Sequence, residues 1–273
     1  MTQSEVRRFI KEMQDLSTIP AVLGKILSII KNENSSPQDL YRLISHDQAF
    51  AERVARVANS ALFGHSGQIK DIRQAIMFLG YNRIKSIALG MTIMDIFPAK
   101  GFNIKNLWIH SYEVAFLSAA ISEFVPMTSP RECFLAGLLH DIGRVIFYKL
   151  DHKGFLGLGT GDDLFEREKE VFDCTHAEAG AWFAEESGLP EEVIKVVRFH
   201  HKPSLTDAYR DSVSIVSLGE ALSRRFSPRI EDDGIWTEEH EAIILEFSIG
   251  EGEIATIGER FYGVKGDIER FFE

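Results

Sequence analysis

The apolar positions of this chain recur at helical spacing, and alternating strand patterns are nearly absent. In the clearest run, residues 134, 135, 138, 139, 142, 145 and 146 are apolar, which is the three- and four-residue spacing of a buried helix face. Similar patterns predict helices from residue 37 onward and over 71–79, 81–96, 104–124, 131–148, 175–187, 190–199 and 207–225, with one or two short helices near the C-terminus. The 104–124 helix is expected to be amphipathic. The sequence therefore predicts an all-α fold.

Capping residues support several of these helices. Ser36 followed by Pro37 is typical of a helix start, because serine caps the first turn and proline fits the first helical position. Thr175 with Glu178 three residues later has the pattern of a capping box. Four glycines within 154–161 predict a loop, and since no strand precedes them a nucleotide-binding fingerprint is not indicated.

A segment with proline and glycine, residues 97–102, coincides with a change in charge. Residues 1–100 carry 13 Lys/Arg and 9 Asp/Glu, whereas residues 101–273 carry 17 and 32. We therefore expect an N-terminal helical subdomain over 1–100, a helical bundle over 101–226 and a C-terminal helical extension over 227–273.

Composition excludes several functional classes. The net charge of −11 argues against non-specific nucleic-acid binding, which needs a basic surface. No apolar stretch approaches the roughly 18–20 residues of a membrane span, and the polar N-terminus lacks the apolar core of a signal peptide. Cys133 and Cys174 form no CxxC pair, which suits a reducing compartment. We expect a cytoplasmic protein.

His140 and Asp141 lie within the apolar run, where an unpaired polar or charged group costs several kcal/mol. A metal ion would be a partner for both at once. Other candidate ligands come from other predicted helices, at intervals of about 25 to 35 residues: His110, His176, His200 and His201. Because each interval is roughly one helix and a connection, antiparallel neighbours in a bundle can bring all of them to one point.

This set of ligand types also indicates which metal is expected. Imidazole and carboxylate together suit first-row ions such as Fe, Mn, Zn or Ni. Structural zinc sites close with four ligands, usually including cysteine, and this set is larger. Two ions bridged by Asp141 would account for all of these ligands. We therefore expect two divalent transition-metal ions, Fe, Mn or Ni rather than structural zinc.

At these residues the chain resembles the HD superfamily of metal-dependent phosphohydrolases, which is named after the His-Asp pair. Further motifs make it similar to the HDOD family of bacterial signalling domains, a relative of the HD-GYP phosphodiesterases. The motifs span about residues 10–225: Ile19-Pro20, Ile44-Ser45-His46-Asp47, residues 59–64 (Asn-Ser-Ala-Leu-Phe-Gly), residues 75–80, residues 138–144, residues 176–180 and Gly188-Leu189-Pro190.

The resemblance implies an all-α fold in which an N-terminal helical subdomain packs on an HD-like bundle, and a role in signal transduction. The implied metal ligands are His110, His140, Asp141, His176, His200, His201 and, where the family has an aspartate, Glu220. Two departures stand out. Lys202 to Leu205 replaces the Gly-Tyr-Pro signature after His201, which argues against a cyclic-di-GMP substrate, and Asp47-Gln48 replaces the family's Asp-Pro, which changes a turn.

Two functions remain open. In the first, the chain is a metal-dependent hydrolase of a phosphoester or nucleotide ligand, with catalytic roles for Asp141 and for Arg144. Arg144 follows Asp141 by one turn and either holds a phosphate or is an ordinary surface arginine. In the second, the chain is a catalytically silent signalling or scaffold module that binds a partner protein. The retained ligands favour the first function, whereas the family and Glu220 favour the second.

Other histidines are not expected to bind metal. His46-Asp47 is a second His-Asp pair without histidine partners nearby in the sequence. His65, His152 and His240 are expected at the surface.

Overall fold

The computed structural model describes residues 1–15, 21–32, 34–59, 69–97, 102–159, 161, 163–227 and 236–272. Within these residues all regular structure is helical, which confirms the all-α prediction. The helices are α1 (Gln3–Asp15), α2 (Ala21–Lys31), α3 (Pro37–Ser45), α4 (Gln48–Ala58), α5 (Ile72–Leu79), α6 (Tyr81–Ile96), α7 (Phe102–Ser122), α8 (Pro130–Leu139), α9 (Ile142–Leu150), α10 (His152–Gly157), α11 (Leu164–Phe172), α12 (His176–Glu186), α13 (Glu191–Phe199), the 3₁₀ helix η2 (Pro203–Leu205), α14 (Arg210–Phe226), α15 (Glu238–Glu246) and α16 (Glu251–Phe271).

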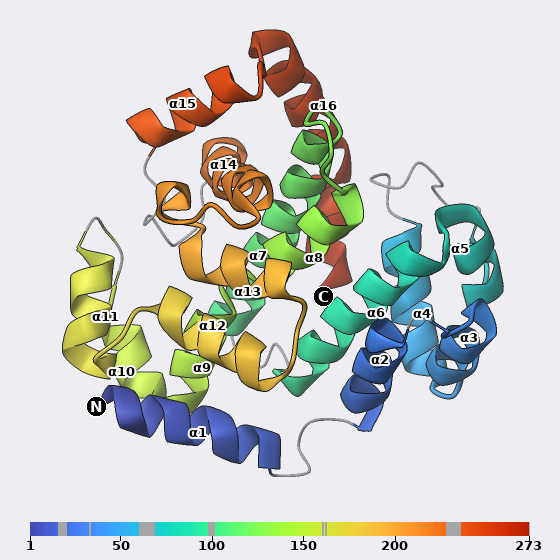
Figure 1. The fold of residues 1–273 in the computed structure, drawn as a ribbon, viewed down its shortest axis with the longest axis horizontal. Coiled ribbons are helices and arrows are strands. Elements are labelled where there is room, and N and C mark those ends of the chain that lie inside the picture. Colours follow the sequence, from blue (N-terminus) through green and yellow to red (C-terminus); the bar gives the residue numbers. More distant parts are fainter. Residues whose placement is uncertain are drawn as a thin grey trace.

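Helix α6 lies between helices α2 to α5 and the helix bundle that contains α7 and α8 (Figure 1). Helices α2, α3, α4 and α5 pack on one another and on α6, whereas α8 packs on α6 from the bundle. Most of α6 is buried, including Ile87 and Ile93, because neighbours cover it on both sides. One hydrophobic core consequently runs from Val6 to Ile268.

Helix α7 is the centre of the bundle. It packs on α8, α14 and α16, and residues 107–122 are all buried. The prediction of an amphipathic helix over 104–124 was therefore wrong: other helices cover α7, so residues 107–122 leave no face exposed to solvent.

The expected single helix over 131–148 is broken at the His-Asp pair. Helix α8 ends at Leu139 and α9 begins at Ile142, with Asp141 between them at φ −100° and ψ 17°. The cause is a close approach to the neighbouring helix, because a Cβ at Gly143 would lie 1.9 Å from the carbonyl oxygen of His176. The break lets α9 pack against the start of α12.

Two further expectations need correction. The glycines of 154–161 do not prevent a helix, because Asp151 caps the backbone NH of Gly154 at 2.9 Å and starts α10. The helices near the C-terminus are not all short, since α16 has 21 residues and packs on α7. The motifs at Ile19-Pro20 and 60–64, and the 98–101 part of the expected boundary, lie outside the described residues.

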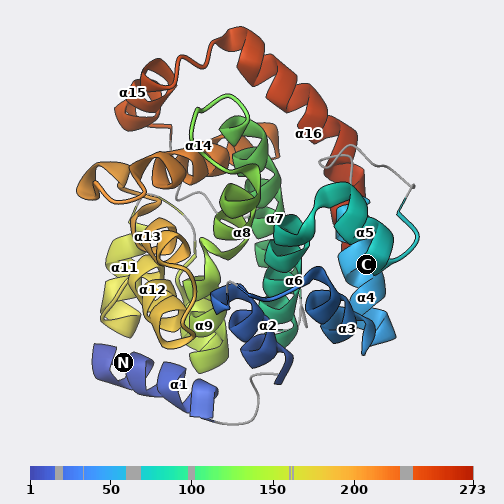
Figure 2. The ribbon, with the colours of Figure 1, turned by 45° about the vertical axis from the view of Figure 1, so that its right-hand side comes forward.

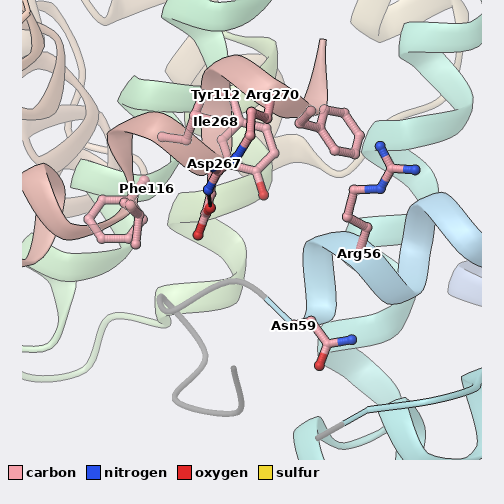
Figure 3. A pocket seen from close by; sticks show the side chains of 9 residues that line it. Arg56, Asn59, Tyr112, Phe116, Asp267, Ile268 and Arg270 are labelled. Atoms are coloured by element: carbon pink, nitrogen blue, oxygen red, sulfur yellow. Dashed lines mark hydrogen bonds and ion pairs between the residues drawn. The ribbon is translucent and has the colours of Figure 1, made fainter. Parts of the chain in front are cut away.

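The two ends of the chain adjoin other parts of the fold. Helix α1 packs on α12 and α9 rather than on its neighbours in sequence (Figure 2). The end of α16 reaches α4 around a cavity of about 260 Å³, where Arg56 lies across from Tyr112 and Arg270 (Figure 3). None of the candidate metal ligands lines this cavity. No helix in the described part of the chain combines the length and the apolar character that crossing a bilayer requires.

Candidate metal centre

The structure brings all seven sequence-predicted metal ligands together in the bundle. They come from α7 (His110), the α8–α9 junction (His140 and Asp141), the start of α12 (His176), the end of α13 (His200 and His201) and α14 (Glu220). Six of the seven are at most 7% exposed, and His201 is the most exposed.

The ligands fall into two sets of four, and in each set the ligand atoms lie within 4.8 Å of one another. Position A is formed by Asp141, His176, His200 and His201. Position B is formed by His110, His140, Asp141 and Glu220. Asp141 belongs to both sets.

The two oxygens of Asp141 face opposite positions. Its Oδ1 lies 3.2 Å from Nε2 of His176 and 3.7 Å from Nε2 of His200. Its Oδ2 lies 3.6 Å from Nε2 of His140 and 3.1 Å from Nε of Arg144. One carboxylate can thus serve both sets without rotating.

Backbone hydrogen bonds orient two of the imidazoles. Nδ1 of His140 donates to the carbonyl oxygen of Gly137 at 2.7 Å, and Nδ1 of His200 donates to that of Val197 at 2.9 Å. Since a carbonyl can only accept, these bonds place the proton on Nδ1 and leave the Nε2 lone pair directed at the centre. This is the usual way in which a protein prepares a metal-binding histidine.

Charge in the centre also favours metal binding. Burial lowers the pKa of His110 to about 3 and also lowers that of His140, so both rings are neutral, the form that ligates metals. Burial raises the pKa of Asp141, but the charge of Arg144, together with a hydrogen bond from His176, outweighs burial and holds it well below its usual range. The carboxylate is therefore ionised.

The residues fit a transition-metal ion. The Nε2 atoms of His110, His140 and His200 are buried and make no hydrogen bond in the described structure. Such unsatisfied buried groups cost free energy, which coordination to an ion would recover. The nitrogen and oxygen donors, without cysteine, suit a first-row divalent ion.

Glu168, a fully buried residue on α11, was not predicted from the sequence as part of the centre. Its Oε1 accepts from Nδ1 of His176 at 2.8 Å, and its Oε2 accepts from the backbone NH of His176 at 2.9 Å. Burial lowers the pKa of His176, but Glu168 outweighs burial and raises it to about 9, so an ion that binds this ring displaces a proton. The signal in the sequence was the spacing of Leu164, Glu168 and Phe172, which share one buried face.

Replacing Glu168 by glutamine is expected to weaken metal binding about 10- to 100-fold, the usual effect of removing the carboxylate behind a metal-binding histidine. The amide lacks the negative charge and offers one acceptor oxygen where the carboxylate offers two. Isothermal titration with Mn²⁺ measures the change. Glu166→Gln, at an exposed position of the same helix, is the control, and equal affinities in the two variants would contradict the prediction.

Three further residues considered in the sequence, Arg144, Asp47 and His240, have clear positions in the structure. Arg144 is 2% exposed, so the alternative of a surface arginine is wrong. Asp47 accepts from the backbone NH of Phe50 and caps α4, and it belongs to neither set of ligands. His240 was expected at the surface but is buried, because its Nε2 packs against the Ser217 hydroxyl at 3.3 Å.

His152 is exposed, as expected. His65 lies outside the described residues.

Several solved structures share this fold. An HDOD domain protein of unknown function from Geobacter sulfurreducens is 21% identical, with a TM-score of 0.75 over 99% of this chain and 96% of its own. A candidate phosphohydrolase from Shewanella amazonensis SB2B is 21% identical, with a TM-score of 0.74 over 97% and 96%. A candidate signal transduction protein from Marinobacter aquaeolei VT8 is 17% identical, with a TM-score of 0.77 over 98% and 64%. At these identities the likeness concerns the fold.

Sequence comparison finds two relatives. An uncharacterized protein of Treponema pallidum (strain Nichols) is 25% identical over 223 residues, which are 78% of this chain and 43% of the relative. Ribonuclease Y of Aquifex aeolicus is 27% identical over 119 residues, 44% of this chain and 17% of the enzyme. The chain thus spans less than half the length of either relative.

The family model of the HDOD domain matches residues 16–203, which include helices α2 to α13 and six of the seven candidate ligands. This range covers well over half of the chain, and it agrees with the helical fold and with the motifs around the His-Asp pair. The chain belongs to the HDOD domain family.

Proposed function

We propose that this HDOD protein is a metal-dependent phosphohydrolase in a signalling pathway, with two divalent transition-metal ions at positions A and B. The observation that carries the proposal is the pair of four-ligand sets that share the buried Asp141. Two ions held in this way are typical of enzymes that hydrolyse phosphoesters. The substrate is a phosphoester or nucleotide ligand.

Each residue has a definite task in this proposal. When bound, the ions supply Lewis-acid activation of water and of the phosphoryl oxygens. Asp141 bridges the positions, and the imidazoles present Nε2 in orientations fixed by their Nδ1 hydrogen bonds. Arg144, buried beside Asp141, donates hydrogen bonds to a phosphoryl oxygen. Burial excludes bulk water and strengthens these charge interactions.

The second candidate function is a catalytically silent module that binds a partner protein. One observation favours it: Oε1 of Glu220 is paired with Nη2 of Arg224 at 2.8 Å, so a carboxylate of position B already has a positively charged partner. Exposed apolar side chains on α5, Met77 and Phe78 at 69% and 43% exposure, are a suitable contact for such a partner.

Metal analysis of protein purified without an affinity tag tests the centre itself. We expect about two equivalents of a transition metal when both positions fill. Fewer than about 0.2 equivalents, even after reconstitution with Fe, Mn or Ni, would contradict the proposal, because such a partly filled centre could not serve as a two-metal site.

A phosphoester panel with wild type, Asp141→Ala and Glu220→Asp separates the two functions. We expect little or no hydrolysis of cyclic dinucleotides, and metal-dependent hydrolysis of another phosphoester that Asp141→Ala abolishes. Turnover of a cyclic dinucleotide would contradict the first expectation. Silence across the panel with metal bound would favour the scaffold, and a gain in Glu220→Asp would show that the extra methylene of Glu220 keeps the centre idle.

A further inference from the structure

The two positions of the centre differ in how their carboxylates are paired. We propose that Arg144 and Arg224 keep position B in a state of low cation affinity, and that a phosphoryl anion releases it by drawing both guanidinium groups to itself. This inference rests on the proposed metal centre and describes how that centre is regulated.

Both carboxylates of position B have an arginine partner. The Asp141 oxygen on the side of His140, Oδ2, lies 3.1 Å from Nε of Arg144. Oε1 of Glu220 lies 2.8 Å from Nη2 of Arg224, one helical turn later on α14. The two negative charges that position B offers to a cation are thus already balanced by two positive charges.

Position A is arranged differently. The Asp141 oxygen on this side, Oδ1, faces the rings of His176 and His200. Behind His176 stands Glu168, which accepts the hydrogen bond of its Nδ1. An ion at position A therefore meets an Asp141 oxygen that faces imidazole rings, whereas an ion at position B meets two carboxylate oxygens that face guanidinium groups.

Burial makes this difference large. The side chains of Arg144 and Arg224 are 3% and 10% exposed, and those of Asp141 and Glu220 are 1% and 3% exposed. Charges interact more strongly at such depth than at a solvated surface, and salt screens them less. We expect the first ion to occupy position A and the second to bind position B much more weakly.

A phosphoryl group is the ligand that would reverse this state. Guanidinium groups form paired, charge-assisted hydrogen bonds with phosphate. When Arg144 and Arg224 turn to an anion, two buried carboxylates lose their positive partners and attract a cation in their place. Anion and second ion consequently raise each other's affinity, since such coupling is reciprocal.

The exposure of the side chains indicates where the anion would arrive. The side chains of Arg224 and His201 are 10% and 12% exposed, whereas that of Arg144 is 3% exposed. The anion would therefore meet Arg224 before the more deeply buried Arg144.

Calorimetric titration of the metal-free full chain with Mn²⁺, with and without inorganic phosphate, tests the inference. In wild type we expect one tight ion and a second at least about 10-fold weaker, and phosphate should tighten only the second, within the roughly 5- to 150-fold range of such couplings. In Arg224→Gln the second ion should bind tightly without phosphate, and the phosphate effect should shrink. Arg225→Gln, at the next and exposed position of α14, is the matched control and should behave as wild type.

The outcomes are distinguishable. Two ions of equal affinity, or two ions that do not respond to phosphate in wild type, would overturn the inference and leave the proposed function standing. Loss of the second ion in Arg224→Gln would also overturn it, because Arg224 would then be positioning Glu220 for the ion. Binding of no ion would overturn the proposed function as well. The titration of wild type with and without phosphate needs no variant, so it tests the inference even if Arg224→Gln does not fold.

Discussion

Replacing Asp141 by alanine is expected to abolish metal binding at both positions and to destabilise the metal-free protein by about 3–5 kcal/mol. Asp141 is the residue common to both ligand sets. The substitution also removes the carboxylate that lies 3.1 Å from Nε of the buried Arg144. Removing one partner of a buried ion pair lowers the free energy of unfolding, because the other charge loses its compensation. The loss of bound metal removes a further stabilisation of the native state by mass action.

Metal content and thermal unfolding of the variant measure both effects. Asp141→Asn, which keeps the size of the side chain, should lose the metal with a smaller loss of stability. Asp47→Ala is the control: Asp47 caps α4, so it should cost about 1 kcal/mol and leave metal content unchanged. Retention of metal by Asp141→Ala would mean that the ligands lie elsewhere.

The helical fold and most members of the candidate centre could be predicted because both follow from the spacing of residues along the chain. Apolar positions at three- and four-residue intervals specify helices whatever their neighbours are. The histidines fall at intervals of about one helix and one connection, so a bundle brings them together. Glu220, by contrast, was reached only through the family resemblance, and its position beside His110 and His140 agrees with it.

The rest depends on contacts between helices that no local pattern records. Glu168 stands among exposed charged residues, and only the approach of α11 to α12 makes it the partner of His176. In the same way, the pairing of Arg224 with Glu220 and of Arg144 with Asp141 determines the charge at position B. The helix break at His140-Asp141 was missed because its cause lies on α12, more than 30 residues away in the sequence.

That cause can be tested at Gly143, where alanine is expected to destabilise the protein by about 3 kcal/mol or more, at or above the upper end of the usual cost of overpacking. The new Cβ would lie 1.9 Å from the carbonyl oxygen of His176, 2.6 Å from its carbonyl carbon and 2.9 Å from the backbone nitrogen of Gly180. All three are backbone atoms, which cannot turn away as a side chain can. The methyl group therefore fits only if α9 and α12 move apart.

Because α12 carries His176 and α9 follows Asp141, that movement would also widen the 3.2 Å contact between Oδ1 of Asp141 and Nε2 of His176. We therefore expect Gly143→Ala to lower the affinity of the first, tight Mn²⁺ site. The free energy of unfolding, measured in denaturant, should fall as well. Gly24→Ala is the matched control: a Cβ at this exposed position of α2 meets no atom within 4 Å, so alanine should stabilise the protein by about 0.4–1 kcal/mol. Wild-type stability and metal affinity in Gly143→Ala would show that the two helices do not approach closely, and the explanation of the break at the His-Asp pair would fail with it.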